Sequence, residues 1–192
     1  MRVALLVCAL AGLARAETVR VELGVGGIES MDDSWLLLMG SSTAVVPELV
    51  VFGDVGAGLE VGGFLRGVIE GGEGSFFQAS TEFDFLDIGA RVRWSWRGLG
   101  WVRPFVWADV ALAYTEVSLG ARDTTTWGAS AGGHAGVEFL SGPLLGALRI
   151  GASLSAGYLW RSAVATGPDD GTSPGDLSLH GPGYRFAITG VF

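Results

Sequence analysis

Residues 184–192 read Tyr-Arg-Phe-Ala-Ile-Thr-Gly-Val-Phe and alternate in character up to the last residue of the sequence. Successive side chains of a β-strand point to opposite faces, so this stretch predicts a strand with one apolar face. That face holds Tyr184, Phe186, Ile188 and Phe192, and the other holds Arg185, Ala187 and Thr189. Chain ends usually fray, and an apolar strand at an open sheet edge invites aggregation. A strand that closes a barrel against the first strand must stay ordered to its end, so the stretch predicts such a barrel.

The N-terminal segment, residues 1–16, has the pattern of a secretory signal peptide. Arg2 precedes an apolar core over residues 3–13, and Ala14-Arg15-Ala16 forms a small-residue cleavage site. The core is too short to span a bilayer. The one cysteine, Cys8, lies in this core, so the exported chain is expected to contain no disulfide. We expect cleavage after Ala16 and a barrel domain over residues 17–192.

The composition argues against nucleic-acid binding and against membrane-spanning helices. The formal net charge is -8 at pH 7, which makes phosphate backbones poor partners. Mean hydropathy is positive, at +0.44, but no run of 18 apolar residues follows the signal. Glycine supplies 32 of the 192 residues, against a usual share of about 7%, and it suits crowded barrel interiors and bends. The apolar residues are therefore spread over strands.

Alternation of apolar and polar residues predicts eight strands. The segments are 18–28, 35–45, 49–65, 80–96, 102–114, 127–139, 144–161, and the last from about residue 177 to the end. The segment 35–45 alternates poorly and is the weakest of the eight. In 80–96 the phase slips near Phe85-Leu86, which predicts a β-bulge there. The predicted fold is all-β, an eight-stranded antiparallel up-and-down transmembrane barrel.

The predicted connections alternate between short and long. Short turns are expected at 46–48, 97–100 and 140–143, and longer polar loops at 29–34, 70–79, 118–126 and 162–176. Short turns on one rim and long loops on the other are typical of bacterial outer-membrane barrels, whose long loops face outward from the cell. The chain is therefore expected in the outer membrane after export.

Large aromatic residues fall into two belts beside these rims. Those beside the short turns are Trp94, Trp96, Trp101, Phe139 and Phe192, and those beside the long loops are Trp35, Tyr114, Trp127, Tyr158 and Trp160. The stretch from Val102 to Tyr114 climbs roughly 30 Å at about 3.3 Å per residue and a tilt near 40°, enough to cross the apolar band. A soluble β-sandwich also alternates, but it explains neither belt.

The inward faces of the predicted strands carry charges of both signs. The arginines are Arg20, Arg66, Arg91, Arg93, Arg103, Arg149, Arg161 and Arg185, and the carboxylates are Glu22, Asp54, Glu60, Asp87, Asp109 and Glu138. An eight-stranded barrel is just wide enough for side chains to fill, and buried charges must be paired. Guanidinium groups match carboxylates two bonds at a time. We therefore expect ion pairs that plug the lumen; the alternative is a narrow or gated path lined by some of the same pairs.

The mature chain resembles the OmpA/OmpX-like superfamily of small outer-membrane barrels. Two stretches carry the resemblance, Trp101-Val102-Arg103-Pro104-Phe105-Val106 after a short turn and Gly136-Val137-Glu138-Phe139-Leu140 before a turn with a proline. The resemblance implies that the barrel-assembly machinery reads the aromatic end of the last strand. Tyr184, Phe186, Ile188 and Phe192 fit that signal, whereas Gly190 stands where an apolar side chain is more usual.

These observations predict a monomeric, non-enzymatic outer-membrane protein without cofactor or metal, with a structural or surface-interaction role. Its expected partners are outer-membrane lipids and lipopolysaccharide, and it is not expected to bind nucleic acid. The first alternative is a narrow channel for small solutes or hydrophobic compounds. The acidic outer loops, such as 169–176, either bind divalent cations or are simply solvated.

The second alternative is a lipid-modifying enzyme, because some small barrels place a serine, a histidine and an acid near the membrane surface. His134 is expected inside the barrel, and Gly136 stands where a deacylase of this type would carry a serine. His180 lies near Ser178 and Asp176 in sequence, residue types that can form a nucleophile and its base.

Overall fold

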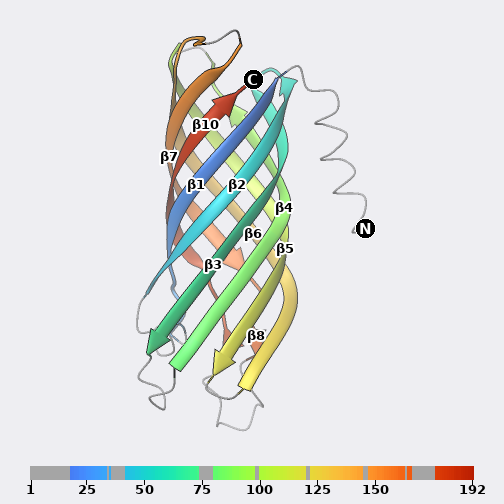
Figure 1. Ribbon diagram of the computed structural model, residues 1–192, viewed down its shortest axis with the longest axis vertical. Helices are drawn as coiled ribbons and strands as arrows, with labels where there is room; N and C mark the ends of the chain where they lie inside the picture. Colours follow the sequence, from blue (N-terminus) through green and yellow to red (C-terminus); the bar gives the residue numbers. More distant parts are fainter. Residues whose placement is uncertain are drawn as a thin grey trace.

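Eight strands close into one antiparallel barrel in the order β1-β10-β7-β6-β5-β4-β3-β2 (Figure 1). The structure is a computed structural model that describes residues 18–33, 35, 42–73, 80–97, 100–119, 122–144, 147–162, 164–165 and 176–192. The barrel strands are β1 (Val19–Glu29), β2 (Thr43–Gly56), β3 (Leu59–Glu73), β4 (Ser80–Ser95), β5 (Val102–Leu119), β6 (Arg122–Leu140), β7 (Arg149–Arg161) and β10 (Gly181–Val191). A separate two-stranded pair joins β8 (Val164–Ala165) to β9 (Asp176–Leu177). The predicted fold class is confirmed.

The last strand closes the barrel against the first. β10 pairs with β1 from Ile28↔Gly183 to Arg20↔Val191. Beyond that ladder, the Val19 N–H donates to the Phe192 carbonyl at 3.1 Å and the Phe192 N–H to the Val19 carbonyl at 2.9 Å. The alternation of this strand is as predicted, because Tyr184, Phe186, Ile188 and Phe192 are exposed while Arg185, Ala187 and Thr189 are buried. The expected signal peptide, residues 1–16, lies outside the described residues.

The third predicted strand, 49–65, and the predicted turn before it are wrong. Of the second predicted strand, 35–45, residues 43–45 belong to β2 and residues 36–41 lie outside the described residues. The predicted strand 49–65 is a hairpin of β2 and β3, and the predicted turn 46–48 lies inside β2, where Pro47 pairs with Val25. The β2–β3 ladder begins at Glu48↔Arg66, so Pro47 stands just outside it and its missing N–H is tolerated. The true turn has three successive left-handed residues, Gly56 (φ 100°), Ala57 (φ 53°) and Gly58 (φ 81°).

Strand β4 contains no bulge, contrary to the sequence prediction. It pairs with both neighbours in unbroken register through Phe85 and Leu86. Phe83 and Phe85 are buried on the inward face, while Glu82 and Leu86 are exposed on the outward face. The apparent slip arose because the polarity of the two faces reverses near the long loops. The register irregularity that the structure does show lies in β2, between Asp54 and Gly56.

Two hairpins run further toward the long loops than predicted. The β5–β6 ladder continues to Leu119↔Arg122, and the β3–β4 ladder continues to Glu73↔Ser80. The predicted loops 118–126 and 70–79 are correspondingly shorter. Polar residues such as Ser118 and Asp123 suggested a loop, but they occupy paired strand positions beyond the outer aromatic belt.

The long-loop end of the barrel interior is filled by an apolar plug. This plug consists of Ile28, Trp35, Ala44, Val46, Val68, Phe83, Phe85, Val117, Leu159 and Leu179. Trp35 is fully buried in it, and its ring meets the Phe83 ring edge-on at 4.7 Å. Its predicted place in the outer aromatic belt is therefore wrong, because the segment after β1 turns inward over the lumen. Among the described residues, no helix is long and apolar enough to cross a membrane.

Candidate functional site

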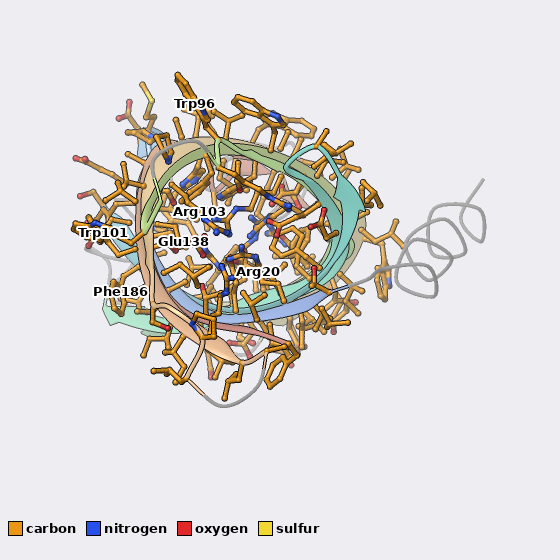
Figure 2. All side chains as sticks on the ribbon, turned by 90° about the horizontal axis from the view of Figure 1, so that it is seen from above. Arg20, Trp96, Trp101, Arg103, Glu138 and Phe186 are labelled. Carbon is orange, nitrogen blue, oxygen red and sulfur yellow. The ribbon has the colours of Figure 1, made fainter. Side chains whose placement is uncertain are left out.

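The candidate site is a network of buried charges in the lumen, to which every barrel strand contributes (Figure 2). This lumen network comprises Arg20, Arg66, Arg91, Arg93, Arg161 and Arg185, with Glu22, Glu48, Glu60, Asp87, Asp109 and Glu138. Figure 2 shows Arg20 and Glu138 inside the ring of strands, and Trp96, Trp101 and Phe186 outside it. The alternation of side chains along each strand brings these groups together. Equal numbers of each sign make the network neutral.

The part of the network next to the plug is built around Asp87. Arg161 donates to Asp87 Oδ1 from Nε at 3.1 Å and from Nη2 at 2.8 Å. Arg66 donates to Asp87 Oδ2 from Nε at 3.2 Å and from Nη2 at 2.9 Å. The Ser130 hydroxyl donates to the same oxygen at 2.8 Å. Asp87 is fully buried, and its charge is neutralised by two guanidinium groups.

Arg91 continues the network toward the middle of the barrel. It donates to Glu48 Oε1 at 2.8 Å and Oε2 at 2.5 Å, a two-bond pairing of guanidinium and carboxylate. It also donates to Asp109 Oδ2 at 2.7 Å, and Arg66 reaches the same oxygen at 3.4 Å. Glu48 was missed from the sequence because it was assigned to the predicted turn 46–48, whereas it lies inside β2.

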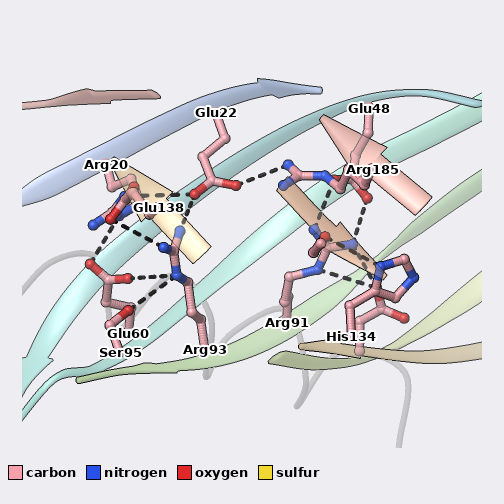
Figure 3. Close-up of polar contacts among 12 residues, drawn as sticks. Arg20, Glu22, Glu48, Glu60, Arg91, Arg93, Ser95, His134, Glu138 and Arg185 are labelled. Carbon is pink, nitrogen blue, oxygen red and sulfur yellow. Dashed lines mark hydrogen bonds and ion pairs between the residues drawn. The ribbon is translucent and has the colours of Figure 1, made fainter. Parts of the chain in front are cut away.

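Arg185 joins the two halves of the network (Figure 3). Its Nε lies 2.6 Å from Glu48 Oε1, and its Nη2 donates to Glu22 Oε2 at 2.9 Å. On the neighbouring strand β1, a Cβ at Gly24 would lie 2.9 Å from Arg185 Nε. Glycine at position 24 therefore leaves room for the guanidinium that connects the halves.

The half of the lumen network near the short turns is a cluster in which two arginines and three glutamates contact one another (Figure 3). Arg20 donates from Nε to Glu60 at 3.0 Å and from Nη1 to Glu138. Arg93 donates to Glu22, and its Nη2 lies 3.2 Å from Glu138 Oε2. Each carboxylate contacts both arginines, so removing one side chain leaves several charges with fewer partners.

Aromatic rings support the guanidinium groups. Arg91 lies 3.7 Å from the Trp107 ring centre and 4.8 Å from that of Phe64. Arg93 lies over Phe105 and Arg161 over Phe85, each at 4.1 Å. Such cation–π contacts strengthen when water is excluded. Inward aromatic side chains therefore both pack against the guanidinium groups and stabilise their charge. The alternation of apolar and polar residues did not predict this role.

Three charges predicted for the lumen network do not join it. Arg103 and Arg149 lie near the short-turn rim, and neither forms an ion pair among the described residues. Asp54 also lies at that rim, where Arg97 Nη2 donates to its Oδ2 at 2.5 Å and the Arg97 side chain is 41% exposed. Charges at a rim remain close to water and need no fixed partner, although Arg103 Nε is buried without a hydrogen-bond partner among the described residues.

The belt aromatics point outward in the structure. Trp94, Trp96, Trp101, Trp127, Tyr158 and Trp160 are all exposed. Tyr114 faces outward beside Trp127, its cross-strand partner, with ring centres 5.2 Å apart. At the other rim the Trp101 and Phe139 ring centres are 5.7 Å apart. Outward acidic residues such as Asp84 and its cross-strand partner Glu116 lie beyond Tyr114, toward the long loops.

The structure brings Ser178 and His180 together near the long-loop rim. Ser178 Oγ and His180 Nδ1 are 3.0 Å apart, and Ser178 Oγ also donates to the Arg161 carbonyl at 3.3 Å. The Ser178 N–H donates to Asp32 Oδ2 at 2.8 Å, and the Met31 N–H to the His180 carbonyl at 2.9 Å. The side chains of 169–176 are outside the described residues. The observed contacts connect the segment after β1 to the segment before β10.

His134 faces the lumen, as the alternation of β6 predicts. Its ring stacks on Trp107 with centres 4.3 Å apart and planes at 13°, and its Nδ1 lies 3.3 Å from Ser155 Oγ. The lumen offers no serine-histidine-acid arrangement at this position among the described residues.

Solved structures with the same strand arrangement cover almost the whole chain. Neisserial surface protein A matches with a TM-score of 0.55 and 15% identity over 91% of this chain and 94% of its own. The chain has the fold of the small eight-stranded outer-membrane β-barrels. Two further structures with this outer-membrane barrel fold are the N-terminal barrel of Pseudomonas aeruginosa OprF (TM-score 0.53, 11% identity, 92% of this chain and 98% of that one) and Yersinia pestis Ail (TM-score 0.53, 15% identity, 92% and 99%). No family model and no curated protein matches the sequence.

Proposed function

We propose that this protein is a non-enzymatic integral protein of the bacterial outer membrane whose closed lumen makes it a rigid anchor that presents its long loops at the cell surface. The lumen network is the observation that supports the proposal most strongly. It is neutral, buried and drawn from all eight strands, and the apolar plug covers it on the long-loop side. The lipid-facing belts fit contact with membrane lipids and lipopolysaccharide, and the outward face of β10 fits recognition by the assembly machinery.

Planar-bilayer recording tests whether the lumen is closed. Purified, refolded protein is expected to show no discrete unitary conductance, because the Asp87 and Arg91 contacts and the buried Trp35 lie across the path. Folding of the same sample is verified by heat-modifiable migration on gels. Reproducible unitary events from folded protein would contradict the anchor and favour the narrow-channel alternative.

An outward arginine tests whether the band between the belts contacts lipid. Val110 is 50% exposed on the outward face of β5, near the middle of that band. We expect Val110→Arg to lower the free energy of unfolding in lipid vesicles by about 2–4 kcal/mol, as for arginine near a bilayer midplane. Chemical denaturation followed by tryptophan fluorescence measures it.

The matched control is Ser118→Arg, which lies on the same strand and the same face but beyond Tyr114. Its expected cost is about 0–1 kcal/mol, because arginine near an interface is tolerated. Equal costs for the two variants would mean that the band does not lie in lipid.

The lipid-enzyme alternative is tested at the closest serine-histidine pair. We expect expression of the protein to leave the mass spectrum of lipid A unchanged, and His180→Ala to leave it unchanged as well, because the Ser178 hydroxyl donates to the Arg161 carbonyl. A lipid A mass shift that depends on expression of the protein and disappears in His180→Ala would overturn the non-enzymatic proposal.

A further inference from the structure

A small cavity lies where the apolar plug meets the lumen network. Its volume is about 30 Å³. Ile28, Val46 and Leu159 line it from the plug, Glu48, Arg66 and Arg185 line it from the network, and Gly26, Gly27, Trp107, His134 and the outward Tyr184 complete its wall. A buried water needs roughly 10–15 Å³ of such space. The cavity is therefore large enough for one or two molecules the size of water.

The charges around the cavity favour binding of an uncharged molecule over an ion. Glu48 would repel an anion, while Arg66 and Arg185 would repel a cation. These three groups already neutralise one another or their network neighbours, since Glu48 pairs with Arg91 and Arg185. A neutral molecule that both donates and accepts hydrogen bonds fits such a wall, whereas an ion would add an unbalanced charge in a dry interior.

The indole N–H of Trp107 independently indicates that a molecule in the cavity must accept a hydrogen bond. Its side chain lines the cavity and is only 6% exposed, and its indole Nε1–H has no hydrogen-bond partner among the described residues. The ring is held between the Arg91 guanidinium, 3.7 Å from its centre, and the stacked His134 ring, 4.3 Å away. It is therefore held in place and cannot readily turn toward a protein acceptor. Buried donors without a partner are rare because they cost stability.

We propose that this cavity is a built water site, in which one or two water molecules accept the indole N–H of Trp107 and donate to the network through the carboxylate of Glu48. Water meets both requirements, since it is neutral and can accept and donate at once. The site lies between the plug and the network, and it supplies the acceptor that the Trp107 indole N–H lacks among the described protein atoms.

Water–protein NMR contacts test the site in ¹⁵N-labelled protein in lipid nanodiscs. We expect the Trp107 Hε1 proton, assigned by its disappearance in Trp107→Phe, to show a direct cross-peak to long-lived water. Trp35 is the matched control, because its Nε1 is also buried and without a partner among the described residues, but it does not line the cavity. Trp35 Hε1 is expected to show no such cross-peak. Absence of the Trp107 cross-peak, or equal cross-peaks at both indoles, would overturn the proposal.

A cavity-filling variant separates a water site from general solvent entry. Val46→Leu adds one methylene to the wall, so we expect the Trp107 cross-peak to weaken at least several-fold while heat-modifiable migration is retained. If this variant does not fold, diffraction from the unaltered protein decides: an ordered water within about 3.2 Å of Trp107 Nε1 supports the site. A dry cavity, or an anomalous peak there after bromide or rubidium soaking, contradicts it.

Discussion

Replacing Asp87 with alanine is expected to lower the free energy of unfolding by about 3–5 kcal/mol, the usual cost of removing one partner from a buried ion pair. Asp87 accepts hydrogen bonds from Arg66, Arg161 and Ser130, with the closest contacts at 2.8 Å. Without it, Arg161 has no carboxylate among the described residues, and the one carboxylate contact left to Arg66 there is Asp109 at 3.4 Å. Urea unfolding in lipid vesicles, followed by tryptophan fluorescence, measures the loss.

Two further variants show whether the loss comes from unpaired buried charge. Arg97→Ala removes the rim partner of Asp54, a solvated pair, and is expected to cost less than about 1 kcal/mol. The double variant Asp87→Leu, Arg161→Met removes one charge of each sign, so the rest of the network stays neutral and Arg66 keeps Asp109 as its carboxylate. It is expected to recover much of the stability lost in Asp87→Ala, because apolar replacement of a buried ion pair is often close to neutral. A double variant less stable than Asp87→Ala would show that the pair contributes net stability.

Trp35→Ala is expected to cost about 3–5 kcal/mol, the range for truncating a large buried aromatic residue. Trp35 is fully buried in the apolar plug and packs edge-on against Phe83. Its removal leaves a void in the plug beside Phe83, Phe85 and Leu179, which lie in distant parts of the sequence. The same denaturation measurement in vesicles determines the cost.

Trp35→Phe is the matched control. It keeps an aromatic ring against Phe83 and removes the indole N–H, which has no partner among the described residues. The loss of packing and the removal of an unpaired donor oppose each other, so the net change is expected to stay within about 1 kcal/mol. An equal loss in both variants would show that the ring contact does not stabilise the plug.

Trp35→Ala also tests the two-layer closure of the lumen. We expect this variant to remain non-conducting in planar bilayers, because Arg161 and Arg66 still meet at Asp87 beneath the plug. Unitary events that appear with Trp35→Ala alone would place the barrier in the plug rather than in the network.

The alternation of side chains let the sequence predict which residues face inward on most strands. Arg20, Glu22, Asp109, Glu138 and Arg185 were assigned to the lumen, and all are buried there. The reason is local: adjacent Cβ atoms in a strand point to opposite faces whatever the strand pairs with. The same rule places Trp101, Trp127 and Phe186 on the outside.

The prediction failed where local polarity did not reflect burial. The left-handed turn at Ala57 carries no strong signal, because an alanine occupies a backbone region that glycine or asparagine usually takes. Pro47 looked like a turn residue, yet it lies in β2 just outside the ladder to β3. Phe83 and Phe85 looked outward because apolar residues were expected to face lipid, whereas near the long loops they form the plug.

The sequence by itself determined that this chain forms strands, and which face of most strands is charged, because both follow from a two-residue period. Its two aromatic belts and its apolar last strand then favoured a barrel over a sandwich. Only the tertiary structure decided which charges meet. Glu22 contacts Arg185, 163 residues away, and Arg20 contacts Glu138, 118 residues away, while Arg103 and Arg149 form no ion pair among the described residues. Those pairings depend on the stagger of eight tilted strands around the barrel and on how far each side chain reaches across the lumen, which no single stretch of sequence encodes.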